Sequence, residues 1–182
     1  MSDIICLLVG ESGSGKTTIC DALERIYDLQ TLASYTTRPP RYVGETGHTF
    51  ITEEEFDTLE GLVGHTTFCG YRYASTCEQV DNSDLYVIDM DGMDFFRKNY
   101  KGKKRVVVVY IHSPIHTRVE RMEKRGDKFG AIMERIVNDA TAFAKAKESA
   151  DLIIYNNDDT RIEDLAERIY AQVFAQQGGD KI

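Results

Sequence analysis

The sequence predicts an α/β fold in which a parallel sheet is flanked by helices and interrupted by a β-rich lobe. Short apolar runs alternate with stretches of helical periodicity at both ends of the chain. Residues 34–84 between them are rich in Thr, Tyr and Gly and have no long helical period. Strands separated by helices imply right-handed crossovers, which make the strands parallel and cover the sheet on both sides.

The core strands are expected at four apolar runs: Ile4 to Val9, Leu85 to Ile88, Val106 to Ile111 and Asp151 to Tyr155. A helix follows the first strand, because Ile19, Leu23 and Ile26 recur at helical spacing. Further helices are expected at 92–100, 114–126, 132–143 and from 160 onward. Two helix starts have the spacing of a capping box, Thr52 with Glu55 and Thr160 with Glu163.

Composition limits the partners. The chain has 182 residues and a net charge of −8, so one domain is expected and no global attraction to nucleic acid or anionic membrane. Its longest apolar run is far shorter than the roughly 20 residues of a membrane helix. The N-terminus carries no basic leader, and four cysteines without CxxC spacing indicate reduced thiols. We therefore expect a cytoplasmic monomer or homodimer that binds neither nucleic acid nor membrane.

The stretch GESGSGKT, residues 10–17, matches the phosphate-loop pattern GxxxxGK[ST] in full. Its glycines let successive N–H groups turn toward one anion, its lysine reaches the terminal phosphates, and its threonine hydroxyl suits Mg²⁺. ATP is therefore expected on Gly13, Ser14, Gly15, Lys16, Thr17 and Thr18. The dinucleotide pattern GxGxxG is not met, and no guanine-reading NKxD motif of a GTPase switch is present.

A second basic cluster lies in SYTTRPPR, where Arg38 and Arg41 flank two prolines. Proline restricts its own φ and the conformation of its predecessor, so the two guanidinium groups are held on a stiff segment. Such a pair suits a phosphate dianion. The alternative is a solvated surface turn.

The phosphate loop, SYTTRPPR, the following G-E-x-G and FCGYRYAS together resemble the guanylate kinase family, in the same order, from about residue 4 to about residue 175. The resemblance implies a core of residues 1–33 and 85–182 and a lobe of 34–84 that binds a nucleoside monophosphate. It also implies a lid at about 125–135 and transfer of the γ-phosphoryl group of MgATP to GMP or dGMP. Arg38, Arg41 and Tyr73 would hold the acceptor phosphate, while Ser34 and Ser75 would face the base.

Departures from the family pattern fall in the acceptor site. His48 stands where the family has a tyrosine on the acceptor phosphate, and imidazole still donates a hydrogen bond. Gly64 stands where the family has a guanine-reading glutamate. Asp89 and Asp91 resemble the family's D-x-D, and strand alternation would direct both to one side, Asp89 to Mg²⁺ with Thr17 and Asp91 to the base. In the other register Asp89 reads the base and the metal-side carboxylate is missing.

The lid segment carries Arg125 and Arg135, which match the family's lid arginines. Phosphoryl transfer requires stabilisation of charge on the moving group, so Lys16, Arg38, Arg125 and Arg135 are the expected catalytic residues. Two alternatives remain: a related sugar-phosphate (ribose bisphosphate) kinase, against which TTRPPR argues, and a non-catalytic protein-binding module, against which the intact phosphate loop argues.

Overall fold

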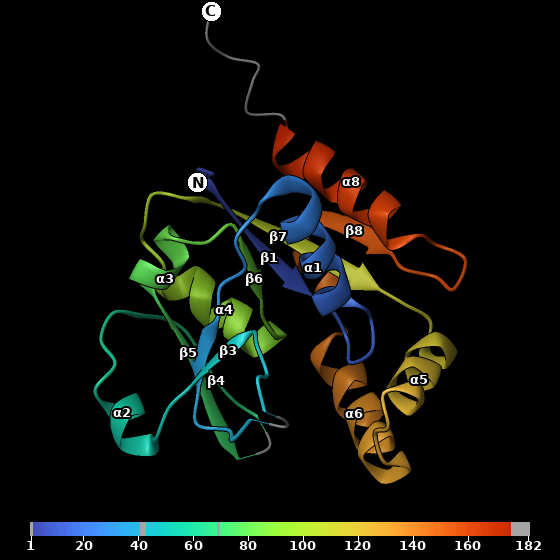
Figure 1. The fold of residues 1–182 in the computed structure, drawn as a ribbon, viewed down its shortest axis with the longest axis horizontal. Coiled ribbons are helices and arrows are strands. Elements are labelled where there is room, and N and C mark those ends of the chain that lie inside the picture. Colours follow the sequence, from blue (N-terminus) through green and yellow to red (C-terminus); the bar gives the residue numbers. More distant parts are fainter. Residues whose placement is uncertain (1, 41–42, 69, 176–182) are drawn as a thin grey trace, which may run out of the picture.

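The computed structural model describes residues 2–40, 43–68 and 70–175, and within them two four-stranded sheets are present (Figure 1). The central sheet has the order β6-β1-β7-β8, and all its neighbouring strands are parallel. Its strands are β1 (Ile4–Val9), β6 (Leu85–Val87), β7 (Arg105–His112) and β8 (Leu152–Tyr155). The predicted α/β fold with a parallel sheet is confirmed.

Both faces of this sheet are covered, and β1, one of its two central strands, is apolar and buried along its whole length. Alternate β1 residues such as Cys6 and Leu8 face α1 (Lys16–Tyr27) and α8 (Ile162–Val173), whereas Ile5 and Leu7 face α4 (Met90–Asn99). Figure 1 shows α1 beside α8 and α4 between the two sheets. The helix predicted from the spacing of Ile19, Leu23 and Ile26 is α1. Ile26 itself is 40% exposed, and the buried stripe of α1 runs through residues 19, 20, 22 and 23.

The second sheet is built from residues 34–76 in the order β3-β2-β5-β4. Its elements are β2 (Ser34–Thr36), β3 (His48–Phe50), β4 (Leu62–Phe68) and β5 (Tyr71–Thr76), with the short helices α2 (Glu53–Asp57) and α3 (Cys77–Asp81). Ser34 pairs with His48, Thr66 with Tyr73 and Gly64 with Ser75. Paired residues share a face, so one side of this sheet presents a row of hydroxyl groups and one imidazole.

The remaining helices are α5 (Ile115–Lys124), α6 (Phe129–Ala142) and α7 (Ala146–Ser149). The first two lie together across from the second sheet in Figure 1. Gly126 ends the α5 segment with φ +90°, a conformation that favours glycine. None of the described helices combines the length and the apolar character needed to cross a membrane.

The two capping predictions have different outcomes. Thr52 and Glu55 form a complete capping box at α2, with both reciprocal hydrogen bonds. Thr160 does not cap α8, because its N–H donates to Asn157 O in a turn and the helix begins one residue later, behind Arg161. The predicted box is wrong there.

Candidate active site

The phosphate loop connects β1 to α1 and needs glycine at two positions. Gly13 has φ +77° and Gly15, the residue before the helix, has φ +94°. A Cβ on Gly13 would also lie 2.7 Å from the carbonyl oxygen of Arg118. The phosphate loop and the first turn of α1 line a cavity, which we call the loop pocket. It is lined by Ser12, Gly13, Gly15, Lys16, Thr17, Thr18, Arg121, Met122, Arg125 and Arg135.

Ser14 is the predicted loop residue that does not line this pocket. It is fully buried, its N–H donates to Glu11 O at 3.1 Å, and its carbonyl oxygen accepts from Asn156 Nδ2 at 2.8 Å. Ser14 thus faces the core beneath the loop and ties the loop to the segment after β8.

Lys16 is turned back onto its own loop. Its Nζ donates to Gly10 O at 2.5 Å and to Glu11 O at 3.1 Å. Burial lowers the pKa of Lys16 to about 8, and the nearby carboxylate of Asp139 partly offsets that lowering. The ammonium must leave these carbonyl oxygens to reach a bound phosphate.

Three guanidinium groups line the loop pocket opposite the loop. Asp127 pairs with both predicted lid arginines, with Arg125 and with Arg135 Nη1, the latter at 3.3 Å. Arg121 donates to Ser113 Oγ at 3.3 Å and to Asn156 Oδ1 at 3.2 Å. The arrangement surrounds the loop with cations and suits a polyphosphate.

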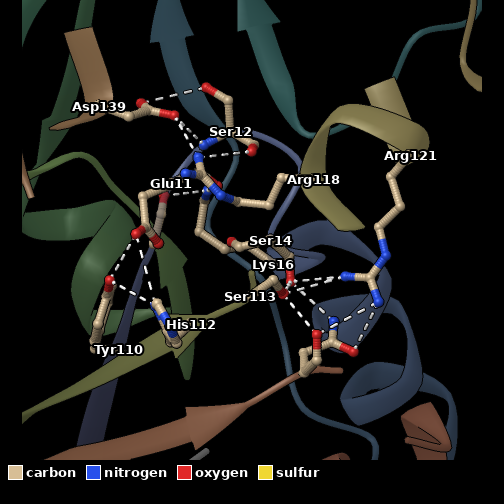
Figure 2. A network of polar contacts seen from close by, with 12 residues as sticks. Glu11, Ser12, Ser14, Lys16, Tyr110, His112, Ser113, Arg118, Arg121 and Asp139 are labelled. Carbon is tan, nitrogen blue, oxygen red and sulfur yellow. Dashed lines mark hydrogen bonds and ion pairs between the residues drawn. The ribbon is translucent and has the colours of Figure 1, made fainter. Parts of the chain in front are cut away.

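A buried ion pair that the sequence analysis missed ties α6 to the phosphate loop (Figure 2). Arg118 Nη1 lies 3.1 Å from Asp139 Oδ2, and their side chains are 5% and 12% exposed. Asp139 Oδ2 also accepts the N–H of Ser12 at 2.8 Å. Arg118 lies three residues before Arg121 on α5, on the same side of the helix. No local sequence pattern connects this arginine to an aspartate 127 residues beyond Ser12.

A second missed group supports the loop from β7 (Figure 2). Tyr110 O–H donates to Glu11 Oε1 at 2.8 Å, and His112 Nδ1 lies 3.7 Å from the same oxygen. Burial, and then the bond to Glu11, raise the pKa of Tyr110 well above its ordinary value. The start of the loop is thereby anchored to the neighbouring strand.

A second cavity, the lobe pocket, lies between the hydroxyl-bearing face of the second sheet and the phosphate loop. It is lined by Gly10, Ser12, Lys16, Ser34, His48, Thr66, Tyr73, Tyr86, Val87, Ile88, Asp89, Asp139 and Phe143. Ser34 Oγ lies 2.9 Å from His48 Nδ1. The structure thus brings four predicted acceptor residues together, and the two pockets share Ser12 and Lys16.

Arg38 lies beside this pocket and does not line it. Its Nη2 pairs with Glu45 Oε1 at 2.8 Å, Nη1 donates to Pro39 O at 2.9 Å, and both ion-paired side chains are buried. The bond to Glu45 raises the pKa of Arg38, with a smaller contribution from Tyr73. Arg38 is therefore engaged by a carboxylate next to Tyr73. Arg41 lies outside the described residues.

Asp89 and Asp91 are not related by strand alternation, so that prediction is wrong. β6 ends at Val87, Asp89 caps α4 by accepting Gly92 N–H at 2.7 Å, and Asp91 is exposed in the first turn. Asp89 lines the lobe pocket, and Thr17 lines the loop pocket. Among the described residues no three acidic, His or Cys side chains gather as a metal cluster. A metal role for Asp89 stays a prediction.

Comparison with known proteins shows which family the chain belongs to. The family model described as guanylate kinase matches residues 3–172. The chain belongs to the guanylate kinase family. This confirms the predicted resemblance, and the family match covers the phosphate loop, both sheets and residues 125–135.

Two curated guanylate kinases illustrate how distant the relatives are. That of Clostridium acetobutylicum is 29% identical over 133 residues, which cover 67% of this chain and 61% of the relative. The chain thus spans less than two thirds of that relative. The guanylate kinase of Syntrophotalea carbinolica is 27% identical, with 93% of this chain and 86% of the relative covered.

Two solved structures share the fold of this guanylate kinase family member. The crystal structure of guanylate kinase from Anaplasma phagocytophilum has a TM-score of 0.64 at 22% identity, covering 96% of this chain and 86% of that one. Shikimate kinase from Acinetobacter baumannii, in complex with shikimate, has a TM-score of 0.54 at 15% identity, with coverages of 96% and 94%.

Proposed function

We propose that this protein transfers the γ-phosphoryl group of ATP to a nucleoside monophosphate, with GMP or dGMP as the first candidates. The observation that carries the proposal is the meeting of two pockets at Lys16 and Ser12. A donor phosphate on the loop and an acceptor in the lobe pocket would then approach at one point. The named activity of the curated relatives supports this reading.

The donor would lie in the loop pocket, with its phosphates on the N–H groups at the start of α1. Lys16 would exchange the carbonyl oxygens of Gly10 and Glu11 for phosphate oxygens. Arg125 and Arg135 would exchange part of their contact with Asp127 for the same ligand. Positioning and charge stabilisation are most of what this reaction requires, so no covalent intermediate is proposed.

The acceptor would lie in the lobe pocket. Tyr73, His48 and Ser34 supply hydrogen-bonding groups there. Arg38 would join them when its pairing with Glu45 loosens, and Arg41 on the same stiff segment would complete the phosphate site. A dianion entering beside Arg38 competes directly with the Glu45 carboxylate, so acceptor binding would be coupled to movement of residue 45.

The donor set of the loop pocket fits Mg²⁺ together with ATP. Thr17 lines this pocket, and a hydroxyl oxygen beside phosphate oxygens and waters is a usual magnesium environment. When bound there, the ion neutralises charge on the β- and γ-phosphates. We further propose a cytoplasmic enzyme with a core of residues 1–33 and 85–182, an acceptor lobe at 34–84 and a lid at about 125–135.

The test is ADP release with MgATP and a panel of acceptors: the common nucleoside monophosphates, their deoxy forms and ribose bisphosphates. Acceptor-dependent turnover is expected, and Lys16→Ala should abolish it while circular dichroism stays that of the parent. Lys124→Ala, an exposed lysine on α5, is the matched control. Lack of acceptor-dependent turnover on every compound would refute the proposal.

A further inference from the structure

The backbone of Ser12, in the phosphate loop, is held by an ion pair whose members come from two helices (Figure 2). Asp139 Oδ2 on α6 accepts Ser12 N–H at 2.8 Å. Arg118 Nη1 on α5 donates to Ser12 O at 3.5 Å and lies 3.1 Å from Asp139 Oδ2. One ion pair therefore binds both the donor and the acceptor of this loop residue. We call Ser12, Arg118 and Asp139 together the Ser12 joint.

Little water reaches the Ser12 joint. The side chains of Arg118 and Asp139 are 5% and 12% exposed. The backbone of α5 also packs on the loop, since a Cβ on Gly13 would lie 2.7 Å from Arg118 O. Because solvent does not replace the partners of buried charges, α6 leaves the loop only at a cost in free energy. The joint therefore anchors α6 to the phosphate loop.

Arg135 lies one helical turn before this anchor. Residues four apart on a helix share a face, so Arg135 lines the loop pocket on the side of α6 that carries Asp139. With a rise of 1.5 Å per residue, Arg135 is about 6 Å along the axis from Asp139, and Phe129, the first residue of α6, is about 15 Å away. A rotation of α6 about the joint therefore moves Arg135 less than half as far as Phe129.

The two predicted lid arginines differ in how their backbones are held. Arg125 follows α5 and precedes Gly126, whose φ is +90°, and the Arg125 side chain is 52% exposed. Arg135 has a side chain that is 28% exposed and belongs to the helix that the Ser12 joint anchors. Of the two cations, Arg135 is therefore the one whose backbone is fixed by buried contacts with the phosphate loop.

We propose that Asp139 is a positioning residue for phosphoryl transfer: paired with Arg118, it fixes α6 on Ser12 and so holds Arg135 toward the loop pocket before ATP binds. This inference rests on the proposed kinase function. Asp139 acts through Arg135 and takes no part in the transfer itself. A cation that is already in place needs no reorganisation when charge develops on the transferred group, and such preorganisation is what makes electrostatic stabilisation effective.

The first test is a double-mutant cycle on kcat. Asp139→Ala should lower kcat by about 10- to 100-fold, and by no more than Arg135→Ala does. The variant with both substitutions should stay within about threefold of Arg135→Ala alone, because the residue that Asp139 positions is already missing. Glu134→Ala is the matched control, since it removes an exposed carboxylate from the same helix, and it should keep the parent kcat.

The second test separates positioning from stability. Asp139→Ala leaves the charge of Arg118 buried without its partner, and adding Arg118→Met removes that charge, so the urea midpoint should rise again. The anchor is still missing in this double variant, so its kcat should stay within about threefold of Asp139→Ala. Asp139→Asn keeps an oxygen for Ser12 N–H and should recover part of kcat. All assays are run at a temperature where circular dichroism shows every variant folded.

Amide hydrogen exchange provides a readout that does not depend on activity. In Asp139→Ala, peptides from residues 129–142 should exchange at least about tenfold faster than in the parent, because local opening of α6 no longer breaks buried contacts. Peptides from β1 report global unfolding and serve as the internal reference. Glu134→Ala should exchange like the parent in both regions.

Each outcome decides a different point. If the losses in kcat from Asp139→Ala and Arg135→Ala multiply, Asp139 does not act through Arg135. If kcat returns together with stability in the variant carrying Asp139→Ala and Arg118→Met, the role of Asp139 is structural only and the inference is overturned. Unchanged exchange in α6 of Asp139→Ala would show that Asp139 does not anchor the helix. Absence of turnover in the parent overturns the proposed function itself, and hydrogen exchange then still decides whether Asp139 anchors α6.

Discussion

Replacing Asp139 by alanine removes the carboxylate that joins α6 to the phosphate loop. Ser12 N–H loses its acceptor at 2.8 Å, and Arg118 loses its partner at 3.1 Å. Because the arginine side chain is only 5% exposed, its charge is left almost without solvent. Removing one partner of a buried pair costs about 3–5 kcal/mol of stability.

Urea denaturation measures this loss as a lower midpoint. Asp139→Asn keeps an oxygen for Ser12 N–H but not the charge, so we expect a smaller loss than in the alanine variant. Adding Arg118→Met to Asp139→Ala should recover part of the stability, because no buried charge then lacks a partner. Asp164→Ala, an exposed site on α8, is the control and should stay within about 0.5 kcal/mol of the parent.

Two results would contradict this reasoning. A loss below about 1 kcal/mol in Asp139→Ala would mean that the pair is not buried in solution. Strict additivity of the Arg118 and Asp139 substitutions would mean that the two groups do not interact.

Three further predictions concern the same site. Burial lowers the pKa of Lys16 from 10.5 to about 8. Between these two pH values the unfolded chain binds more protons than the folded protein, so stability should rise with pH across that window, by at most roughly 3 kcal/mol. Denaturation of the parent and of Lys16→Met at pH 7 and pH 10 tests this, and an equal pH dependence in both proteins would count against it. Gly64→Ala should lose about 1–3 kcal/mol through two contacts of the added Cβ below 3 Å, with Ser75 Oγ and the Tyr86 hydroxyl, and less when combined with Tyr86→Phe, as read from melting temperatures. Arg135→Ala should lower kcat by roughly 100-fold or more, because it removes a cation from the loop pocket, where the proposed donor phosphates would lie. The exposed Arg25→Ala should leave kcat unchanged, and a wild-type kcat in Arg135→Ala would remove Arg135 from the proposed mechanism.

Much of the core was predictable because its signals are local. The four core strands are apolar runs, and β1 is buried along its whole length as such a run requires. The capping box at Thr52 needs only residues three apart. The strand prediction was wrong where the sequence gave no sign that the strand ends. Asp89 and Asp91 have the spacing of alternating strand residues, but β6 ends at Val87 and Asp89 caps α4.

The sequence by itself determined the phosphate loop, because glycine dihedrals, the lysine and the threonine act within eight consecutive residues and need no distant partner. Only the tertiary structure decided that Asp139 closes on Ser12 and that Tyr86 fills the space over Gly64. Those contacts join segments 127 and 22 positions apart, and packing of α6 and of the two sheets, which no short pattern encodes, brings them together.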